Sequence, residues 1–178
     1  MVVRKRTFLL VALIVVVLGL WVFLALNCPS AGIPITPQKW KEHRLKNRTG
    51  FPLAADFDLN LTLDALLQPG EDRNRWSTDR AARVQGLVID VAYAGVEGAN
   101  CFNPCRRDIH IVIAKQKEAP KSEQVVIEVT PNLRDWAAQQ GMDWSEQTLQ
   151  AQLVDHWCEF EGWLYFDEGH AEESENRS

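Results

Sequence analysis

The feature that most constrains this chain is an uninterrupted apolar run near its start. Residues 7–26 read TFLLVALIVVVLGLWVFLAL, which holds neither a charge nor a proline. At about 1.5 Å of rise per residue, a helix of this length spans roughly 30 Å, the thickness of the hydrocarbon core of a bilayer. The run is longer than the apolar stretch of about 7–15 residues in a secretory signal peptide. We therefore predict a transmembrane anchor over residues 7–26.

Two alternatives to a permanent anchor stay open. A cleaved signal peptide needs a small-x-small cleavage site, and Ala25-Leu26-Asn27 fits that pattern poorly. A lipoprotein signal would be processed at Cys28, but Asn27 and Pro29 beside it fit that processing badly. With a permanent anchor, Cys28 lies where the chain leaves the membrane, and we expect it to be inert or acylated.

The basic residues on either side of the run predict how the chain is inserted. Arg4, Lys5 and Arg6 directly precede the run, whereas the first basic residue after it is Lys39. Lysine and arginine are enriched on the cytoplasmic side of membrane helices. We therefore expect residues 1–6 in the cytoplasm and the remainder outside, in a single-pass protein of the cytoplasmic (inner) membrane.

The net charge argues against nucleic acid as a partner. Without Arg4, Lys5 and Arg6, the chain keeps 16 of its 19 basic residues against 24 acidic ones, a balance of −8. A stand-alone single-strand-binding protein needs a basic surface to attract phosphates. We therefore expect no binding of nucleic acid.

Residues 27–50 have the composition of a stem or linker. Prolines, Gly32 and Ser30 crowd the first part of this segment, which is typical of irregular structure. Its basic residues are Lys39, Lys41, Arg44, Lys46 and Arg48. They would be solvated in a flexible stem, or they could lie on anionic lipid headgroups with Trp40 as an aromatic anchor.

Residues 51–170 carry the pattern of a small β-domain, followed by a polar tail at 171–178. Apolar residues alternate with polar ones at 83–93, 108–114, 124–130 and 157–166, which predicts strands with one buried face. The residues expected to face the core are Leu87, Ile89, Val91, Tyr93, Ile109, Ile111, Ile113, Val125, Ile127, Val129, Cys158, Phe160, Leu164 and Phe166. A shorter alternation at 56–61 predicts one further short strand.

One or two short helices are expected between the third and fourth strands. Thr130-Pro131 is a good N-cap and first-turn pair, and Gly141 is a natural stop. Asp143 with Glu146 forms a possible capping box for a second helix. The order strand, strand, strand, helix, strand is that of an OB-fold, a small five-stranded barrel. The predicted fold class is mainly β, an OB-like small barrel or partly open sheet, with one N-terminal transmembrane helix.

Several segments resemble a family of small, mostly uncharacterised bacterial proteins with an OB-like fold. These segments are GLVIDV at 86–91, the pair Asn100-Cys101, RDIHIVIA at 107–114, VVIEVTP at 125–131 and EGWLYFDEGH at 161–170. Members of the family often continue with a further segment rich in Trp and His. The resemblance therefore implies that the closing strand of the barrel is missing here or is supplied by residues 56–61. The resemblance implies no established activity. The periplasmic location that we expect for this domain follows from the predicted orientation of the anchor.

Polar side chains on the predicted sheet form the first candidate site. Asp108 and His110 are two residues apart on one strand, so they project from the same face, and Glu128 projects on that side of the next strand. If the register aligns them, an imidazole and two carboxylates converge within reach of a metal ion or of acid–base chemistry. Asp167 and His170 could join them. The alternative is a solvated face in which His110 hydrogen-bonds a carboxylate.

Cysteines form the second candidate. A turn between Cys101 and Cys105 could bring the two thiols together, and outside the cytoplasm a small-loop disulfide is the natural interpretation. Free thiols, or a zinc ion held together with His110, are the alternatives. Cys158 is expected in the core.

Aromatic residues form the third candidate. Trp157, Trp163 and Tyr165 share the outer face of the last predicted strand, where exposed aromatics could stack on bases or sugars. Glu159 and Glu161 lie between them and would repel a phosphate backbone. A protein partner, a glycan, or cover by the second predicted helix fits this composition better.

The sequence lacks a signature that would name a reaction. It holds no P-loop, no G-x-G-x-x-G and no G-x-S-x-G motif. We therefore expect a membrane-anchored extracytoplasmic binding or assembly module, with a protein partner, without a cofactor and not evidently catalytic. Its candidate binding residues are Asp108, His110, Glu128, Trp163 and Tyr165. The alternative is a metal-dependent hydrolase or nuclease that uses Asp108, His110 and Glu128.

Overall fold

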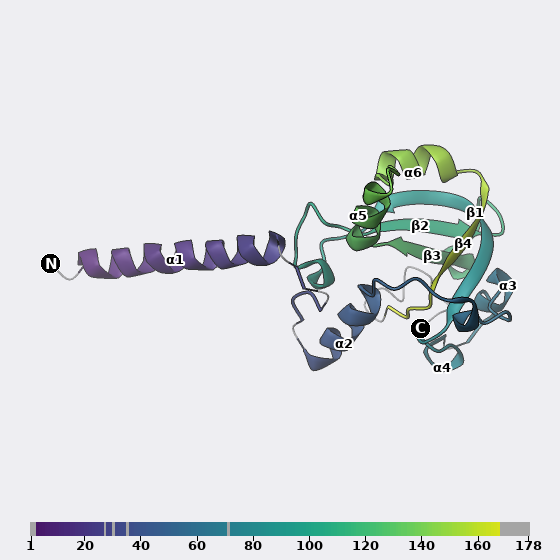
Figure 1. Cartoon of the computed structure of the whole chain (residues 1–178), viewed down its shortest axis with the longest axis horizontal. Coiled ribbons are helices and arrows are strands. Elements are labelled where there is room, and N and C mark those ends of the chain that lie inside the picture. Colours follow the sequence, from purple (N-terminus) through teal and green to yellow (C-terminus); the bar gives the residue numbers. More distant parts are fainter. Residues whose placement is uncertain (1–2, 27, 30, 35, 71, 168–178) are drawn as a thin grey trace.

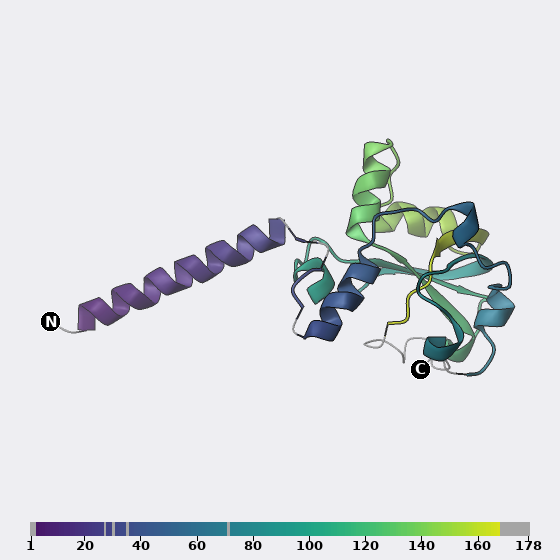
Figure 2. The same ribbon diagram turned by 60° about the horizontal axis from the view of Figure 1, so that its bottom comes forward.

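The first helix of the chain projects away from the other elements, which pack against one another (Figures 1 and 2). The computed structural model describes residues 3–26, 28–29, 31–34, 36–70 and 72–167. The α-helices are α1 (Val3–Leu26), α2 (Pro37–Lys46), α3 (Leu63–Leu66), α4 (Asp72–Arg75), α5 (Pro131–Gln139) and α6 (Glu146–Leu153). The strands are β1 (Ala81–Tyr93), β2 (Ile109–Ala114), β3 (Gln124–Val129) and β4 (Trp157–Trp163). Short 3-10 helices are η1 (Ala54–Asp56), η2 (Gly98–Asn100) and η3 (Lys121–Glu123).

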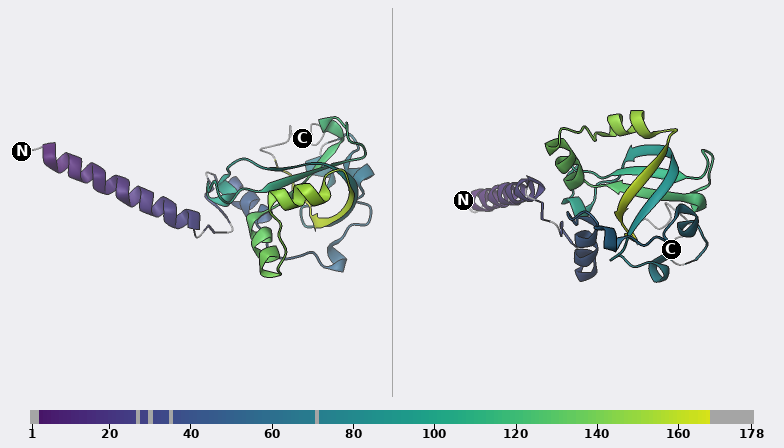
Figure 3. Two further views of the ribbon diagram at one scale, coloured as in Figure 1. Left: turned by 90° about the horizontal axis from the view of Figure 1, so that it is seen from above. Right: turned by 45° about the vertical axis from the view of Figure 1, so that its right-hand side comes forward.

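The four strands form one antiparallel sheet in the order β3-β2-β1-β4. The first half of β1 pairs with β4, and its second half pairs with β2. The long, bent β1 is thus shared between two partners, and the sheet curls into a half-barrel with β4 alongside the first half of β1 (Figure 3). The order of strands, with helices between β3 and β4, is loosely OB-like.

The predicted fold class is corrected from mainly β to mixed α/β. Helices α2, α3 and α4 precede the sheet, in segments whose many polar residues mask helical periodicity. The strand predicted at 56–61 is wrong, because this segment contributes only a single parallel bridge between Phe57 and Ala81. Among the described residues the sheet has four strands, so the barrel is not closed there.

Three of the four predicted strands place their apolar residues as expected, and β1 does not. Its buried residues are Ala81, Ala82, Val84, Gly86 and Val88, followed by Val91. The pairing with β2 is interrupted by a β-bulge between Val88 and Asp90. An extra residue at a bulge moves every following side chain to the other face. The predicted inward positions of Leu87 and Ile89 are therefore wrong, whereas Val91 is correct. Tyr93, also predicted to face inward, is 37% exposed.

The hydrophobic core lies on one face of the curled sheet. Ile109, Ile111 and Ile113 of β2 are almost completely buried there, as predicted. Leucines of the segment around α3 and Leu149 of α6 cover this face. Val125 and Ile127 of β3 and Cys158, Phe160 and Leu164 of β4 and its continuation pack against the same cluster.

The two helices between β3 and β4 follow their capping signals, with one correction. The Thr130 side chain accepts a hydrogen bond from the backbone of Leu133 and begins α5 at Pro131, as predicted. The N-cap of α6 is Ser145 rather than Asp143. Asp143 instead accepts a hydrogen bond from the backbone N–H of Ser145, and so stabilises the turn before the helix.

The predicted apolar run is helical, since α1 covers residues 7–26. The described part of the chain offers no helix with both the length and the apolarity to cross a membrane.

Candidate functional site

The segment predicted as a flexible stem is part of the folded domain. The Thr36 side chain accepts a hydrogen bond from the backbone of Lys39, and Pro37 follows it in the first turn of α2. At the end of this helix, Asn47 donates from Nδ2 to the carbonyl of Ala99 at 2.8 Å. Arg48 donates to the carbonyls of Thr78 and Leu164 at 2.9 and 3.0 Å. These bonds tie α2 to the η2 loop and to the end of β4.

Lys46, the last residue of α2, lies at the centre of a cluster of carboxylates. Its Nζ is 2.7 Å from Glu97, 3.0 Å from Asp108, 3.1 Å from Glu128 and 3.8 Å from Asp167. The Lys46 side chain is only 2% exposed and that of Asp108 is fully buried. We call Lys46 with these four carboxylates the Lys46 cluster. Its members come from five separate parts of the chain.

The sheet register brings together the three residues of the first sequence candidate. His110 of β2 lies opposite Glu128 of β3, and His110 Nε2 is 3.3 Å from Glu128 Oε1. Asn100 Nδ2 donates to Asp108 Oδ1 at 3.0 Å. Asp167 joins the group, as proposed from the sequence, whereas His170 lies outside the described residues. The face is not solvated, because α2 covers it and places Lys46 among the carboxylates.

Burial and opposite charges shift the pKa values of this cluster in different directions. Burial acts to lower the pKa of Lys46, but the charges of Glu128, Asp108 and Glu97 outweigh it and raise the pKa. Burial raises the pKa of Glu97, and the charge of Lys46 offsets this only in part. Burial also acts to raise the pKa of Glu128, but hydrogen bonds from His110 and the charge of Lys46 lower it overall. Of these two glutamates, Glu97 is therefore the one whose charge is less well compensated.

An ammonium group occupies the position at which a metal ion would have to lie. Asp108 and Glu128 both direct carboxylate oxygens at Lys46 Nζ. Across the residues that the structure describes, no group of three or more His, Cys, Asp and Glu side chains is arranged to hold a metal ion. The geometry is that of an ion-pair network with a surplus of negative charge.

A cavity of about 200 Å³ adjoins the Lys46 cluster. Its polar wall is formed by Lys39, His43, Lys46, Glu97, Tyr165 and Asp167. Its apolar wall includes Ile33, Val96 and Phe102. Glu97 Oε2 bonds Lys46, while Oε1 of the same carboxylate is buried without a hydrogen-bond partner among the described residues. A buried acceptor without a donor is unfavourable, so a small displacement of the Glu97 side chain that lets a hydrogen-bond donor reach Oε1 from the cavity is favoured.

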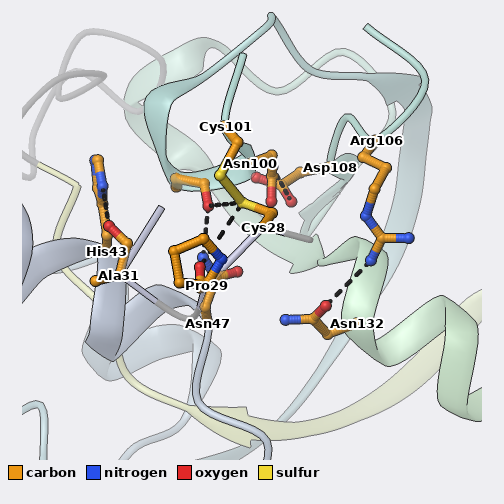
Figure 4. Close-up of a disulfide and its surroundings, with 11 residues drawn as sticks. Cys28, Pro29, Ala31, His43, Asn47, Asn100, Cys101, Arg106, Asp108 and Asn132 are labelled. Carbon is orange, nitrogen blue, oxygen red and sulfur yellow. Dashed lines mark hydrogen bonds between the residues drawn. A yellow bond between two sulfur atoms is a disulfide. The ribbon is translucent and has the colours of Figure 1, made fainter. Parts of the chain in front are cut away.

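The disulfide links Cys28 to Cys101 rather than Cys101 to Cys105 (Figure 4). The predicted small-loop bridge is therefore wrong, and so is the prediction of an inert or acylated Cys28. The backbone of Ile33 donates to the carbonyl of Gly98 at 2.8 Å, which holds the segment after α1 against the η2 loop. The Asn103 side chain accepts from the backbone of Cys105 in a turn that leaves Cys105 exposed, with a free thiol.

Gly32 permits the close contact between this segment and the η2 loop. Its φ is +59°, and a Cβ at this position would lie 2.2 Å from the carbonyl oxygen of Gly98. That distance is far inside van der Waals contact, so a residue with a side chain would push the two segments apart. Gly32, which contributed to the linker prediction, therefore allows the segment after α1 to pack against the η2 loop.

The aromatic candidates separate into different environments. Trp163 Nε1 donates to the carbonyl of Gly50 at 2.7 Å, and the Arg48 guanidinium lies 4.8 Å from its ring. Tyr165 lines the cavity, where burial raises the pKa of its hydroxyl. Trp157 is 61% exposed. The predicted cover by the second helix is wrong, because the segment after α2 covers Trp163 and α6 packs on the core.

A larger hollow of about 250 Å³ lies beside α5 and the turn before α6. Its lining includes Tyr93, Arg106 and Arg134. Arg106 is paired with Asp135 at 2.7 Å, and Arg134 donates to the carbonyl of Arg107. The ion pair in this hollow is a partly exposed one, whereas the other cavity adjoins a buried cluster with more carboxylates than ammonium groups. We therefore regard the cavity beside the Lys46 cluster as the better candidate site.

Sequence reasoning missed Lys46 and Glu97, which organise the site. Lys46 is one of five basic residues in a polar segment, and nothing in its neighbours distinguishes it. The pair Thr36-Pro37 is the same helix-start signal that identified Thr130-Pro131, and could have predicted α2. A scan against protein-family models and searches of curated proteins and of solved structures found no match for this chain.

Proposed function

We propose that this protein is a membrane-tethered, extracytoplasmic binding module whose cavity beside the Lys46 cluster holds a small ligand with a cationic, hydrogen-bond-donating group. The observation that carries the proposal is the wall formed by Glu97 and Asp167. Four carboxylates surround one ammonium in the cluster, and Glu97 Oε1 has no hydrogen-bond partner among the described residues. A protonated amine would supply both the missing positive charge and the missing donor.

The disulfide supports a location outside the cytoplasm. Disulfides such as Cys28–Cys101 persist in oxidising compartments and are rare in the cytosol. This agrees with the orientation that Arg4, Lys5 and Arg6 predict.

The sequence of α1 and its exposed apolar surface support the proposed tether. Its described side chains include Leu10, Val16 and Phe23, each more than 60% exposed. A long helix with apolar side chains on all sides is unfavourable in water and stable in lipid. We therefore keep residues 7–26 as the proposed single-pass anchor.

Labelling of Cys105 in intact cells tests the tether and its orientation. Its thiol is exposed and free, so a membrane-impermeant maleimide should label the full chain without lysis, in the membrane fraction. The C105S chain is the control, which measures any labelling of the partly buried free thiol of Cys158. Labelling only after lysis, or recovery of the full chain in the soluble fraction, would contradict the proposal.

Thermal unfolding of the full chain in detergent tests the binding site. Excess ethanolamine should raise the melting temperature, whereas acetate at the same ionic strength should not. The E97Q chain should lose this response, because it lacks the carboxylate charge at the cavity wall. E161Q is the matched control, since Glu161 is an exposed side chain of β4 and pairs with Arg83. Equal responses of E97Q and E161Q would rule out this site.

A further inference from the structure

The cavity lies close to the end of the proposed anchor. Only one residue separates Leu26, the end of α1, from Cys28, and two residues of extended chain span at most about 7 Å. The disulfide fixes Cys28 to Cys101, directly after η2. In every view, α2 and the loop that contains η2 lie at the end of the domain nearest to α1 (Figures 1–3). If α1 spans a bilayer, this loop therefore lies at the lipid surface.

The same loop forms one wall of the cavity and exposes apolar side chains beside it. Glu97, Gly98 and Phe102 all line the cavity. Val96 and Phe102 are 47% and 39% exposed. Exposed apolar side chains beside a polar cavity are favourable where they meet the headgroup and acyl boundary of a bilayer.

Opposite charges occupy different parts of the cavity wall. Lys39 and His43 belong to α2. The Lys39 ammonium pairs with Glu42 at 2.6 Å, and His43 Nδ1 donates to the carbonyl of Ala31 at 2.9 Å, which fixes the ring. An anionic group of a ligand would therefore have to share Lys39 with Glu42. Glu97 and Asp167 lie on the side of the Lys46 cluster. A ligand with one anionic and one cationic group matches this arrangement, the anion near α2 and the cation near Glu97.

The unsatisfied oxygen of Glu97 distinguishes between cationic groups. A primary ammonium donates three hydrogen bonds, whereas a quaternary ammonium donates none and would leave Glu97 Oε1 without a donor. The volume of about 200 Å³ is smaller than the roughly 300–1,000 Å³ of pockets for drug-sized ligands. It therefore suits a head group and not the acyl chains attached to it.

We propose that the ligand of this site is the phosphoethanolamine head group of a phospholipid in the membrane that holds α1. Its ammonium would bind Glu97 and Asp167, its phosphodiester would lie near Lys39 and His43, and Val96 and Phe102 would contact the glycerol region. This inference rests on the proposed function, because it assumes both the tether and an amine-binding cavity.

The full chain in nanodiscs tests the proposal directly. The melting temperature is measured against the mole fraction of phosphatidylethanolamine in a phosphatidylcholine bilayer, with phosphatidylglycerol as the anionic comparison. We expect a rise with phosphatidylethanolamine alone. Loss of a charge-assisted hydrogen bond should weaken this dependence at least about tenfold in E97Q. E161Q should behave as the wild type.

A rim variant keeps the test valid if E97Q unfolds. K39A removes a half-exposed lysine from the cavity wall and should weaken the dependence on phosphatidylethanolamine, measured as the rise above the melting temperature of the same variant in phosphatidylcholine. K41A, two residues along the same helix and outside the cavity lining, is its control. Equal rises with phosphatidylglycerol would overturn the proposal, because they would indicate only attraction of basic residues to anionic lipid.

The soluble head group separates the two proposals. If glycerophosphoethanolamine stabilises the protein but phosphatidylethanolamine in nanodiscs does not, the lipid proposal fails and the amine-binding function stands. If neither these ligands nor ethanolamine stabilises the protein, both proposals fail.

Discussion

At the scale of single residues, Lys46 is the group on which the site depends. A lysine ammonium that is 2% exposed persists in the fold because carboxylates compensate its charge. Removing it leaves Asp108 and Glu128 buried with a repulsion that no nearby ammonium offsets. K46M should therefore lower the free energy of unfolding by about 3–5 kcal/mol.

Urea unfolding of the full chain in detergent measures this effect. K41M is the matched control on the exposed side of the same helix, and should change stability by less than about 0.5 kcal/mol. A loss below about 1 kcal/mol in K46M would show that the ammonium is not the centre of the network.

Glu97 and Glu128 should give stability opposite dependences on pH. The pKa of Glu97 is raised above its usual 4.5, so its contribution is present below pH 4.5 and is lost as pH rises through the raised pKa. The pKa of Glu128 is lowered, so its contribution is present above pH 4.5 and is lost as pH falls through the lowered pKa. Glutamine at either position removes that dependence.

Unfolding free energies of wild type, E97Q and E128Q at several pH values check these signs. The advantage of the wild type over E97Q should shrink as pH rises above 4.5, and its advantage over E128Q should shrink as pH falls below 4.5. Slopes of the same sign for both variants would contradict the assigned electrostatics.

At the scale of elements, the disulfide joins the segment after α1 to the η2 loop. Cys28 and Cys101 are 73 residues apart, and closing a loop of that length stabilises the fold by about 4 kcal/mol in the chain-entropy account. We expect C28S and C101S to lose stability of this order, and C105S to match the wild type. Mass spectrometry of the unreduced protein should find the bridge in C105S. A bridge between Cys101 and Cys105 in the wild type would refute the pairing.

The elements also show which parts of the fold can be predicted from sequence. Alternation located the four strands, and Thr130-Pro131 located α5, because these signals depend on neighbouring residues. The β-bulge beyond Val88 could not be predicted in this way, since one extra residue reverses the alternation without changing the composition. The disulfide was mispredicted because sequence proximity favoured Cys105, whereas Gly32 brings Cys28 to Cys101 from a distance.

The candidate site was predictable only in part. Asp108, His110 and Glu128 share a sheet face, and the period of a strand indicates this. The burial of that face depends on α2, which reaches it through long-range contacts, so no local pattern marks Lys46 as its centre.

At the scale of the whole molecule, the proposed anchor, the disulfide and the cavity are neighbours along one connected path. The proposed tether ends beside the disulfide, the disulfide holds the η2 loop, and that loop forms a wall of the cavity. A binding module arranged in this way would present its ligand site at the membrane from which its chain emerges.

The two tyrosines of the chain allow the most direct test of its central claim, that the cavity beside Lys46 binds an amine. Tyr165 lines this cavity, and Tyr93 lines the separate hollow beside α5. The measurement is a carbon–proton NMR titration of the full chain, with labelled tyrosine rings, against ethanolamine. We predict a saturable shift of the Tyr165 signals with Tyr93 unchanged. Unchanged signals from both rings, or equal shifts of both, would contradict the account.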